Sequence, residues 1–252
     1  IFLLTRPTNS RSLFDFSPNI RYFYLVLKKM SSLEEMKINL PFRHIAIEGV
    51  MKSGKTKLAK KLAEKIGARV VYDRLDNPYL ADFYNEKEGA AFLAQLVFLV
   101  NRYHQQSALL QRTLFEETII CDYLFEKDKI YAYQTLTDDE LLVYDKIFHI
   151  FSERIAKPDL VIYLQISLPT LLERINRWGS ELEKNISESY LKDILEAFDY
   201  FFFNYQGAPL FVVKADHLVL EDEETIQDLI QKIRQIKKSP LYYVPLAEAK
   251  DD

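Results

Sequence analysis

Short apolar runs alternate along most of the chain with segments that repeat apolar residues at helical spacing. The first apolar run, 44–48, is followed by a turn bounded by glycines and then by a segment in which Leu58, Leu62 and Ile66 recur every four positions. A short apolar run predicts a buried strand, and a four-residue repeat predicts a helix with one apolar face. We therefore interpret this region as strand, loop and helix.

The same alternation continues toward the end of the chain. Strands are expected at 69–72, 118–121, 160–166 and 210–213, and helices at 89–111, 138–155, 168–177, 188–203 and 223–236. Strands that alternate with helices favour a parallel sheet with helices on both faces. We therefore predict one α/β domain at 41–237, with three layers, α/β/α, around a five-stranded parallel sheet. Such sheets bind ligands at the carboxyl ends of their strands.

The N-terminal segment differs in composition from this domain. Residues 1–29 carry five Lys and Arg residues but only one acid, Asp15. Acid-poor segments that contain Arg and Ser occur in organellar presequences. Alternatively, these residues precede a true start of translation at Met30 or Met36. Either interpretation leaves residues 1–40 as an N-terminal extension that is disordered or absent from the mature protein.

The C-terminal segment 238–252 is expected to form a tail. Ser239 and Pro240 follow two lysines and stop the last helical pattern, because proline cannot continue a helix. Within this tail, the apolar run 241–244 can dock on the body or on a second subunit.

Composition restricts the classes of function. The net charge is −4, so the chain lacks the basic excess that binds a nucleic-acid backbone, and nucleic acid is not an expected partner. The single cysteine, Cys121, excludes internal disulfides, and the four histidines offer no zinc-site spacing. No apolar stretch approaches the roughly 18 to 20 residues that cross a bilayer, so no membrane span is expected. A reducing compartment is indicated, either the cytoplasm or, with a genuine presequence, an organellar matrix.

A phosphate-binding loop joins the first strand to the first helix. It consists of Gly49, Val50, Met51, Lys52, Ser53, Gly54, Lys55 and Thr56, which satisfy the pattern G-x-x-x-x-G-K-[ST]. Backbone N–H groups and the helix N-terminus at such a loop bind phosphates. We expect Lys55 to reach the outer phosphates and the Thr56 hydroxyl to bind Mg²⁺. The loop predicts a P-loop NTPase-type fold that binds ATP or GTP, but it does not identify the phosphoryl acceptor.

Further motifs follow the loop in order. They are an acidic strand end with Asn-Pro-Tyr-Leu at 72–80, the series Tyr84, Gln95 and Arg102 with spacings of eleven and seven, the segment 121–128, a Pro-Asp-Leu strand at 157–164 and an arginine-bearing segment at 172–179. Through these motifs, the body from roughly residue 43 to 236 resembles the deoxynucleoside kinase family, and most of all its bacterial deoxyadenosine and deoxyguanosine kinases.

The resemblance implies an ATP- and Mg²⁺-dependent enzyme that phosphorylates the 5′-hydroxyl of a deoxynucleoside, with a purine base expected. It also implies a homodimer and an arginine-bearing lid. Gln95 and Arg102, two turns apart on one helical face, would bind the base, and Asp128 would pair with Arg102. Tyr84 and Glu183 would contact the ribose 3′-hydroxyl. Alternatively, this helical face is apolar core and Arg102 is a surface cation.

The chemistry of such a kinase needs a carboxylate at the hydroxyl, a metal on the phosphates and cations around the transferring group. Asp73 and Asp122 both follow predicted strands at their carboxyl ends. We assign Asp73 as the base that accepts the 5′-hydroxyl proton, with Asp76 as its rival. Asp122 would hold Mg²⁺ through water beside Thr56. A turn or N-cap aspartate is the alternative for each assignment.

The predicted lid carries two arginines. Arg174 and Arg177 are three positions apart, hence neighbours on a helix, and can clamp the γ-phosphate as charge develops. Solvated helix arginines are the alternative. The lid departs from the family pattern, because Trp178 and Ser180 replace the arginines that flank its glycine, and Arg177 is the candidate substitute for one of them.

Two other departures leave alternative functions open. Tyr123 stands where the family has a basic residue, and Asp73 is one methylene shorter than the family's Glu. The segment 119–123 also resembles thymidylate-kinase-like nucleoside monophosphate kinases, although their Arg-Glu-Pro-Gly-Gly run is missing here. A degenerate, nucleotide-binding structural subunit is the third interpretation, which Tyr123 and Ser180 favour and the intact pair Lys55-Thr56 disfavours.

Overall fold

The computed structural model describes residues 39–110, 118–236 and 239–245. These residues form a sheet of six parallel strands in the order β2-β3-β1-β4-β5-β6. The strands are β1 (His44–Glu48), β2 (Arg69–Val71), β3 (Ile119–Cys121), β4 (Leu160–Gln165), β5 (Leu210–Lys214) and β6 (Leu241–Tyr243). Because all strands run in one direction, the loops that follow β1, β2 and β3 meet at the same edge of the sheet.

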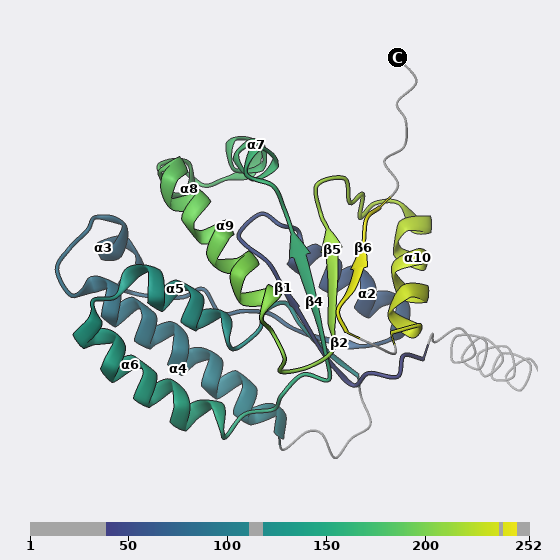
Figure 1. Ribbon diagram of the computed structural model, residues 1–252, viewed down its shortest axis with the longest axis horizontal. Coiled ribbons are helices and arrows are strands. Elements are labelled where there is room, and N and C mark those ends of the chain that lie inside the picture. Colours follow the sequence, from purple (N-terminus) through teal and green to yellow (C-terminus); the bar gives the residue numbers. More distant parts are fainter. Residues whose placement is uncertain (1–38, 111–117, 237–238, 246–252) are drawn as a thin grey trace, which may run out of the picture. The chain divides into compact units, whose positions relative to one another are not determined.

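Helices cover both faces of the sheet (Figure 1). They are α2 (Lys55–Ile66), α3 (Leu80–Tyr84), α4 (Ala90–Leu110), α5 (Lys127–Thr135), α6 (Asp138–Ser152), α7 (Leu168–Trp178), α8 (Glu181–Lys184), α9 (Glu188–Phe203) and α10 (Glu223–Arg234). Helices α2 and α10 lie on one face, and α4, α5, α6 and α9 lie on the other. In the described ranges, no helix combines the length and the apolar character that crossing a bilayer requires.

The core explains why the strands are continuous apolar runs. Successive side chains of a strand point to opposite faces of the sheet. In β4, Val161 and Tyr163 belong to the cluster that packs against α9, and the Tyr163 ring stacks 4.0 Å from the ring of Phe202. Ile162, between them, is also buried. A sheet covered on both faces therefore buries every position of its central strands.

The predicted α/β fold, its three layers and its parallel sheet are confirmed, and the five expected strands are found within one residue of their predicted ends. The predicted number of strands was wrong. Strand β6, in the segment expected to be a tail, pairs with β5 as a sixth strand. The run 241–244 follows Pro240 in a segment assigned to the tail, so it was expected only to dock, and the free edge of β5 provides its partner.

Residues 1–38 of the predicted N-terminal extension and residues 246–252 of the predicted tail lie outside the described residues. Leu40, which the sequence analysis placed in the N-terminal extension, is buried. Three short helices, α3, α5 and α8, were not predicted. Helix α5 matters most for the site, because it begins with Lys127 and Asp128.

Candidate active site

The phosphate-binding loop runs from the end of β1 into the N-terminus of α2, where the sequence predicts it. A Cβ at Gly49 would lie 2.7 Å from the carbonyl oxygen of Leu164, so a side chain does not fit. Gly54 has a φ of 102°, which favours glycine. Lys55 Nζ donates to the carbonyl oxygens of Gly49 (3.0 Å) and Val50 (3.4 Å). The ammonium group therefore lies inside the loop, where a nucleotide's phosphates would bind.

Glu48, the last residue of β1, holds the start of the loop. Its side chain is fully buried, and its two carboxylate oxygens accept from the backbone N–H groups of Gly49 (2.9 Å) and Leu124 (2.8 Å). A buried carboxylate needs such partners, because burial removes its hydration. Burial lowers the pKa of Lys55, and the positive charge of Lys127 lowers that pKa further. Binding of an anion in the loop would relieve both effects.

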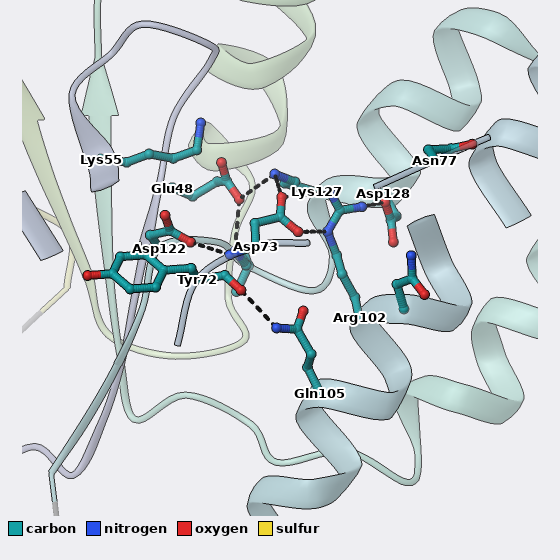
Figure 2. A network of polar contacts seen from close by, with 12 residues as sticks. Glu48, Lys55, Tyr72, Asp73, Asn77, Arg102, Gln105, Asp122, Lys127 and Asp128 are labelled. Carbon is teal, nitrogen blue, oxygen red and sulfur yellow. Dashed lines mark hydrogen bonds and ion pairs between the residues drawn. The ribbon is translucent and has the colours of Figure 1, made fainter. Parts of the chain in front are cut away.

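Asp122, directly after β3, links the loop to the segment that follows β2. Its Oδ2 accepts from Thr56 Oγ1 at 2.6 Å. Its Oδ1 accepts from the backbone N–H of Asp73, also at 2.6 Å, as Figure 2 shows. Within the described residues, no group of three or more His, Cys, Asp and Glu side chains forms a metal site. A hydroxyl beside one carboxylate fits Mg²⁺, which takes few protein oxygens and keeps several waters and phosphate oxygens.

Asp73 is the centre of a buried charge network (Figure 2). Arg102 donates to both of its oxygens, from Nε (2.8 Å) and Nη2 (2.7 Å), and Lys127 Nζ donates to Oδ2 (2.7 Å). Burial would raise the pKa of Asp73, but Lys127 and Arg102 outweigh burial and hold that pKa well below its usual range. Asp73 is therefore ionised at neutral pH. Its rival as base, Asp76, is exposed.

Arg102 also pairs with Asp128 through Nη1, as expected from the resemblance. Burial raises the pKa of Asp128 to about 6, against the opposing effect of Arg102. Asp128 Oδ2 has no hydrogen-bond partner in the described part of the chain. Gln95, also buried on α4, donates to Thr135 Oγ1 at 3.2 Å. The structure therefore brings Gln95, Arg102 and Asp128 into buried positions around α4, while their contact with a nucleoside stays a prediction.

Helix α4 also positions the backbone on both sides of Asp73. Gln105 donates to the carbonyl oxygen of Tyr72 at 2.8 Å, and Asn77 donates to the carbonyl oxygen of Ala94 at 2.8 Å. Because α4 is a long, regular helix, these contacts hold the segment after β2 against a rigid element.

The two arginines of the predicted lid contact different parts of the protein. Arg174 donates to the carbonyl oxygens of Lys52 (3.2 Å) and Ser53 (3.1 Å) in the phosphate loop. Arg177 is exposed, with Cζ 5.0 Å from the ring centroid of Trp178. The structure thus places only Arg174 at the phosphate loop, because a three-residue spacing turns the side chains of α7 apart by about 60°.

Glu183, predicted to contact the ribose, forms an ion pair with Lys52 of the phosphate loop at 2.9 Å. Burial would raise the pKa of Glu183, but hydrogen bonds from Ser180 and Lys52 lower it. The pKa of Tyr84 is raised by burial and by the charge of Glu183. The charge of Glu183 thus acts on Tyr84, while the contact of either residue with a ribose stays a prediction.

Sequence reasoning missed two residues of this site, Glu48 and Lys127. A glutamate at the end of an apolar strand was a usable signal for Glu48. Lys127 gave no signal, because the short helix that carries it was not predicted. Tyr123, which replaces the family's basic residue, is fully buried, and its ring centroid lies 5.9 Å from Arg102 Cζ.

Comparisons with known proteins agree with this geometry. A model of the deoxynucleoside kinase family matches residues 45–238. The deoxyguanosine kinase of Bacillus subtilis (strain 168) is 38% identical over 157 residues, which cover 62% of this chain and 76% of that protein. A deoxyadenosine kinase of Dictyostelium discoideum is 31% identical over 174 residues, covering 66% of this chain and 69% of that protein. The structure of deoxyadenosine kinase from M. mycoides with bound dATP matches 75% of this chain and 98% of its own, with a TM-score of 0.64 and 26% identity. The chain described here belongs to the deoxynucleoside kinase family.

Proposed function

We propose that this protein transfers the γ-phosphoryl group of ATP to the 5′-hydroxyl of a deoxynucleoside. One observation carries the proposal. Asp122 accepts hydrogen bonds both from the Thr56 hydroxyl of the phosphate loop and from the backbone of Asp73, each at 2.6 Å. The nucleotide site and the carboxylate that receives the acceptor are thereby held as one unit, as a reaction between two bound substrates requires.

In the proposed reaction the 5′-oxygen forms a bond to the γ-phosphorus, and the bond from that phosphorus to the bridging oxygen breaks. ADP leaves with the electron pair, and the hydroxyl proton passes to Asp73. Because the pKa of Asp73 is held low, its main contribution is to accept a hydrogen bond and align the hydroxyl. This suffices because phosphoryl transfer has a loose transition state and depends mostly on positioning and charge stabilisation. Lys55 would contact the outer phosphates.

Magnesium is proposed as the metal of the reaction. The oxygens of Thr56, at the start of α2, and of Asp122, directly after β3, would hold it, because the two side chains lie 2.6 Å apart. Held there with the nucleotide, Mg²⁺ would supply positive charge against the negative charge that develops on the phosphates.

The acceptor is proposed to be a purine deoxynucleoside. Two relatives are named deoxyguanosine kinase and deoxyadenosine kinase, which supports this class. The amide of Gln95 and the guanidinium of Arg102 are buried on α4, and such groups match the donors and acceptors at a nucleobase edge. The family match does not favour the nucleoside monophosphate kinase alternative.

A homodimer is also proposed. Helices α4 and α6 pack side by side (Figure 1), and both carry exposed apolar side chains, Leu93, Val100, Leu142, Val143 and Ile150. Neighbouring exposed apolar residues are typical of interaction surfaces. A cytoplasmic location, or an organellar matrix if residues 1–29 are a presequence, is proposed from sequence composition.

The test is to follow ADP release from Mg·ATP with each of the four deoxynucleosides, with dTMP and with no acceptor. Lys55→Ala is the control for the nucleotide site. Release that depends on a deoxypurine, and that Asp73→Asn abolishes, supports the proposal. Release with dTMP alone supports a monophosphate kinase. A folded, ATP-binding protein without acceptor-dependent release is a structural subunit.

A further inference from the structure

We infer that Lys127 is a further catalytic residue, which contacts the phosphoryl group while it is transferred. The inference rests on the proposed function. The transferring group carries negative charge on its equatorial oxygens, and cations around it stabilise the transition state. Tyr123 cannot supply a cation, and Arg177 is directed to solvent. Lys55 and Arg174 provide positive charge at the phosphate loop, and a cation beside Asp73 has to come from another element of the fold.

Lys127 has the position for this role. Its Nζ lies 2.7 Å from Asp73 Oδ2 and 4.0 Å from Glu48 Oε2, between the carboxylate that receives the hydroxyl and the start of the phosphate loop (Figure 2). It is also close enough to Lys55 for its charge to lower the pKa of that lysine. The ammonium group therefore lies between the groups assigned to the acceptor and the donor, where the new bond would form.

The contacts of Lys127 leave donors for a substrate. An ammonium group has three N–H donors. Among the described residues, Nζ makes a hydrogen bond of ordinary length only to Asp73, and Glu48 is at ion-pair distance. A phosphoryl oxygen can accept one of the other N–H groups without displacing Asp73. Lys127 can thus hold the base and the phosphoryl group at the same time.

A purely structural role explains this lysine poorly. Arg102 already donates to both oxygens of Asp73, so Asp73 is paired and oriented without a second cation. Lys127 is buried, close to Lys55, and at the first position of α5, where a positive charge opposes the helix dipole. A second cation also makes Asp73 a weaker base. These effects are all unfavourable until the negative charge of a phosphoryl group arrives.

The proposed step adds one contact to the reaction. As the 5′-oxygen bonds to phosphorus and the bridging bond to ADP breaks, an N–H of Lys127 donates to an equatorial oxygen of the transferring group. Lys127 keeps its proton throughout, and the hydroxyl proton passes to Asp73. The electron pair of the broken bond leaves with ADP, so Lys127 contributes charge and no atoms.

The test compares Lys127→Met with Lys129→Met in the full chain. Methionine keeps the length of the side chain and removes its charge. Lys129 is a matched control because it lies on the same helix, is partly exposed and pairs with Asp145 at 3.2 Å. We expect Lys127→Met to lower kcat by about 100- to 1000-fold, as removal of one transition-state donor does. The KM of the deoxynucleoside should stay within about threefold, and Lys129→Met should leave both constants unchanged.

A second readout is the binding of ADP with aluminium fluoride and deoxynucleoside, which mimics the transition state. Lys127→Met should weaken this complex by the same factor as kcat while ATP binding is kept. Lys127→Arg should recover part of the lost kcat, because it restores the charge. If Lys127→Met does not fold, Lys127→Gln carries the same test, since its amide can still donate to Asp73.

The outcomes separate the two proposals. A kcat unchanged in Lys127→Met, or a loss confined to the KM of the deoxynucleoside, overturns the role of Lys127. If the unaltered protein releases no ADP with any deoxynucleoside, the proposed function fails as well. If the unaltered protein is active and Lys127→Met is equally active, only the role of Lys127 is contradicted, and the proposed function stands.

Discussion

Replacing Arg102 with methionine should destabilise the protein by an amount that depends on pH. The side chain is 4% exposed and donates to both Asp73 and Asp128. After the substitution Asp73 keeps Lys127 at 2.7 Å, whereas Asp128 loses its hydrogen-bonded cation. Removing one partner of a buried pair costs about 3 to 5 kcal/mol. Asp128 can limit this cost by taking up a proton.

The free energy needed to protonate Asp128 is the upper limit of this cost, and it follows from the pKa of aspartate in the unfolded chain. Protonating Asp128 costs about 1.4 kcal/mol for each unit by which the pH exceeds roughly 3.9, hence about 4 kcal/mol at pH 7 and about 1.5 kcal/mol at pH 5. The unaltered protein is also stabilised when Asp128 takes up a proton at low pH, because the pKa of its Asp128 is about 6. A carboxyl with a raised folded pKa favours the folded state more as pH falls. The loss in Arg102→Met should therefore shrink by about 1.4 kcal/mol, one pKa unit, from pH 7 to pH 5.

Urea unfolding followed by circular dichroism at both pH values measures these differences. Arg177→Met is the matched control, because Arg177 is exposed, and it should change the free energy of unfolding by less than about 0.5 kcal/mol. Adding Asp128→Asn to Arg102→Met removes the uncompensated charge and should recover about half of the loss at pH 7. An equal loss at both pH values, without recovery in the double variant, would refute the reasoning.

Three further predictions concern turnover. Asp122→Ala removes the acceptor of two 2.6 Å hydrogen bonds, so kcat should fall at least about 100-fold. The Mg²⁺ concentration needed for half-maximal activity should rise. An unchanged Mg²⁺ titration contradicts this prediction. The kcat/KM for the deoxynucleoside should decrease as the pH drops below about 6, because Asp128 then takes up a proton and no longer orients Arg102. In Asp128→Asn, kcat/KM should be low and should not change with pH across this range. Glu183→Gln should cost less than about 1 kcal/mol of stability, because its pair with Lys52 is partly exposed. Its KM for the deoxynucleoside should rise about tenfold, since an amide accepts a weaker hydrogen bond than a carboxylate, and an unchanged KM argues against a ribose contact.

Local spacing was sufficient to predict the phosphate loop and the two strand ends that Asp73 and Asp122 follow. The phosphate loop stands between a strand and a helix, and its glycines, lysine and threonine are neighbours along the chain. Asp73 and Asp122 follow strands that are parallel, so their meeting at one edge followed from topology. The short elements were harder to predict. Helix α5 has too few residues to show a helical period, and strand β6 stands after the last helix, where its pairing with β5 appears only in the folded chain.

The sequence by itself therefore determined the fold class, the nucleotide loop and the carboxylates, because each depends on residues close along the chain or on strand order. Only the tertiary structure decided which cations pair with Asp73. Arg102 and Lys127 stand 29 and 54 positions from Asp73, and they meet it only when α4 and α5 pack beside the ends of the strands. Lys52 likewise meets Glu183 only across the folded site. Ion pairs need atoms within about 4 Å, and composition and spacing contain no information at that resolution about segments that are distant in the chain.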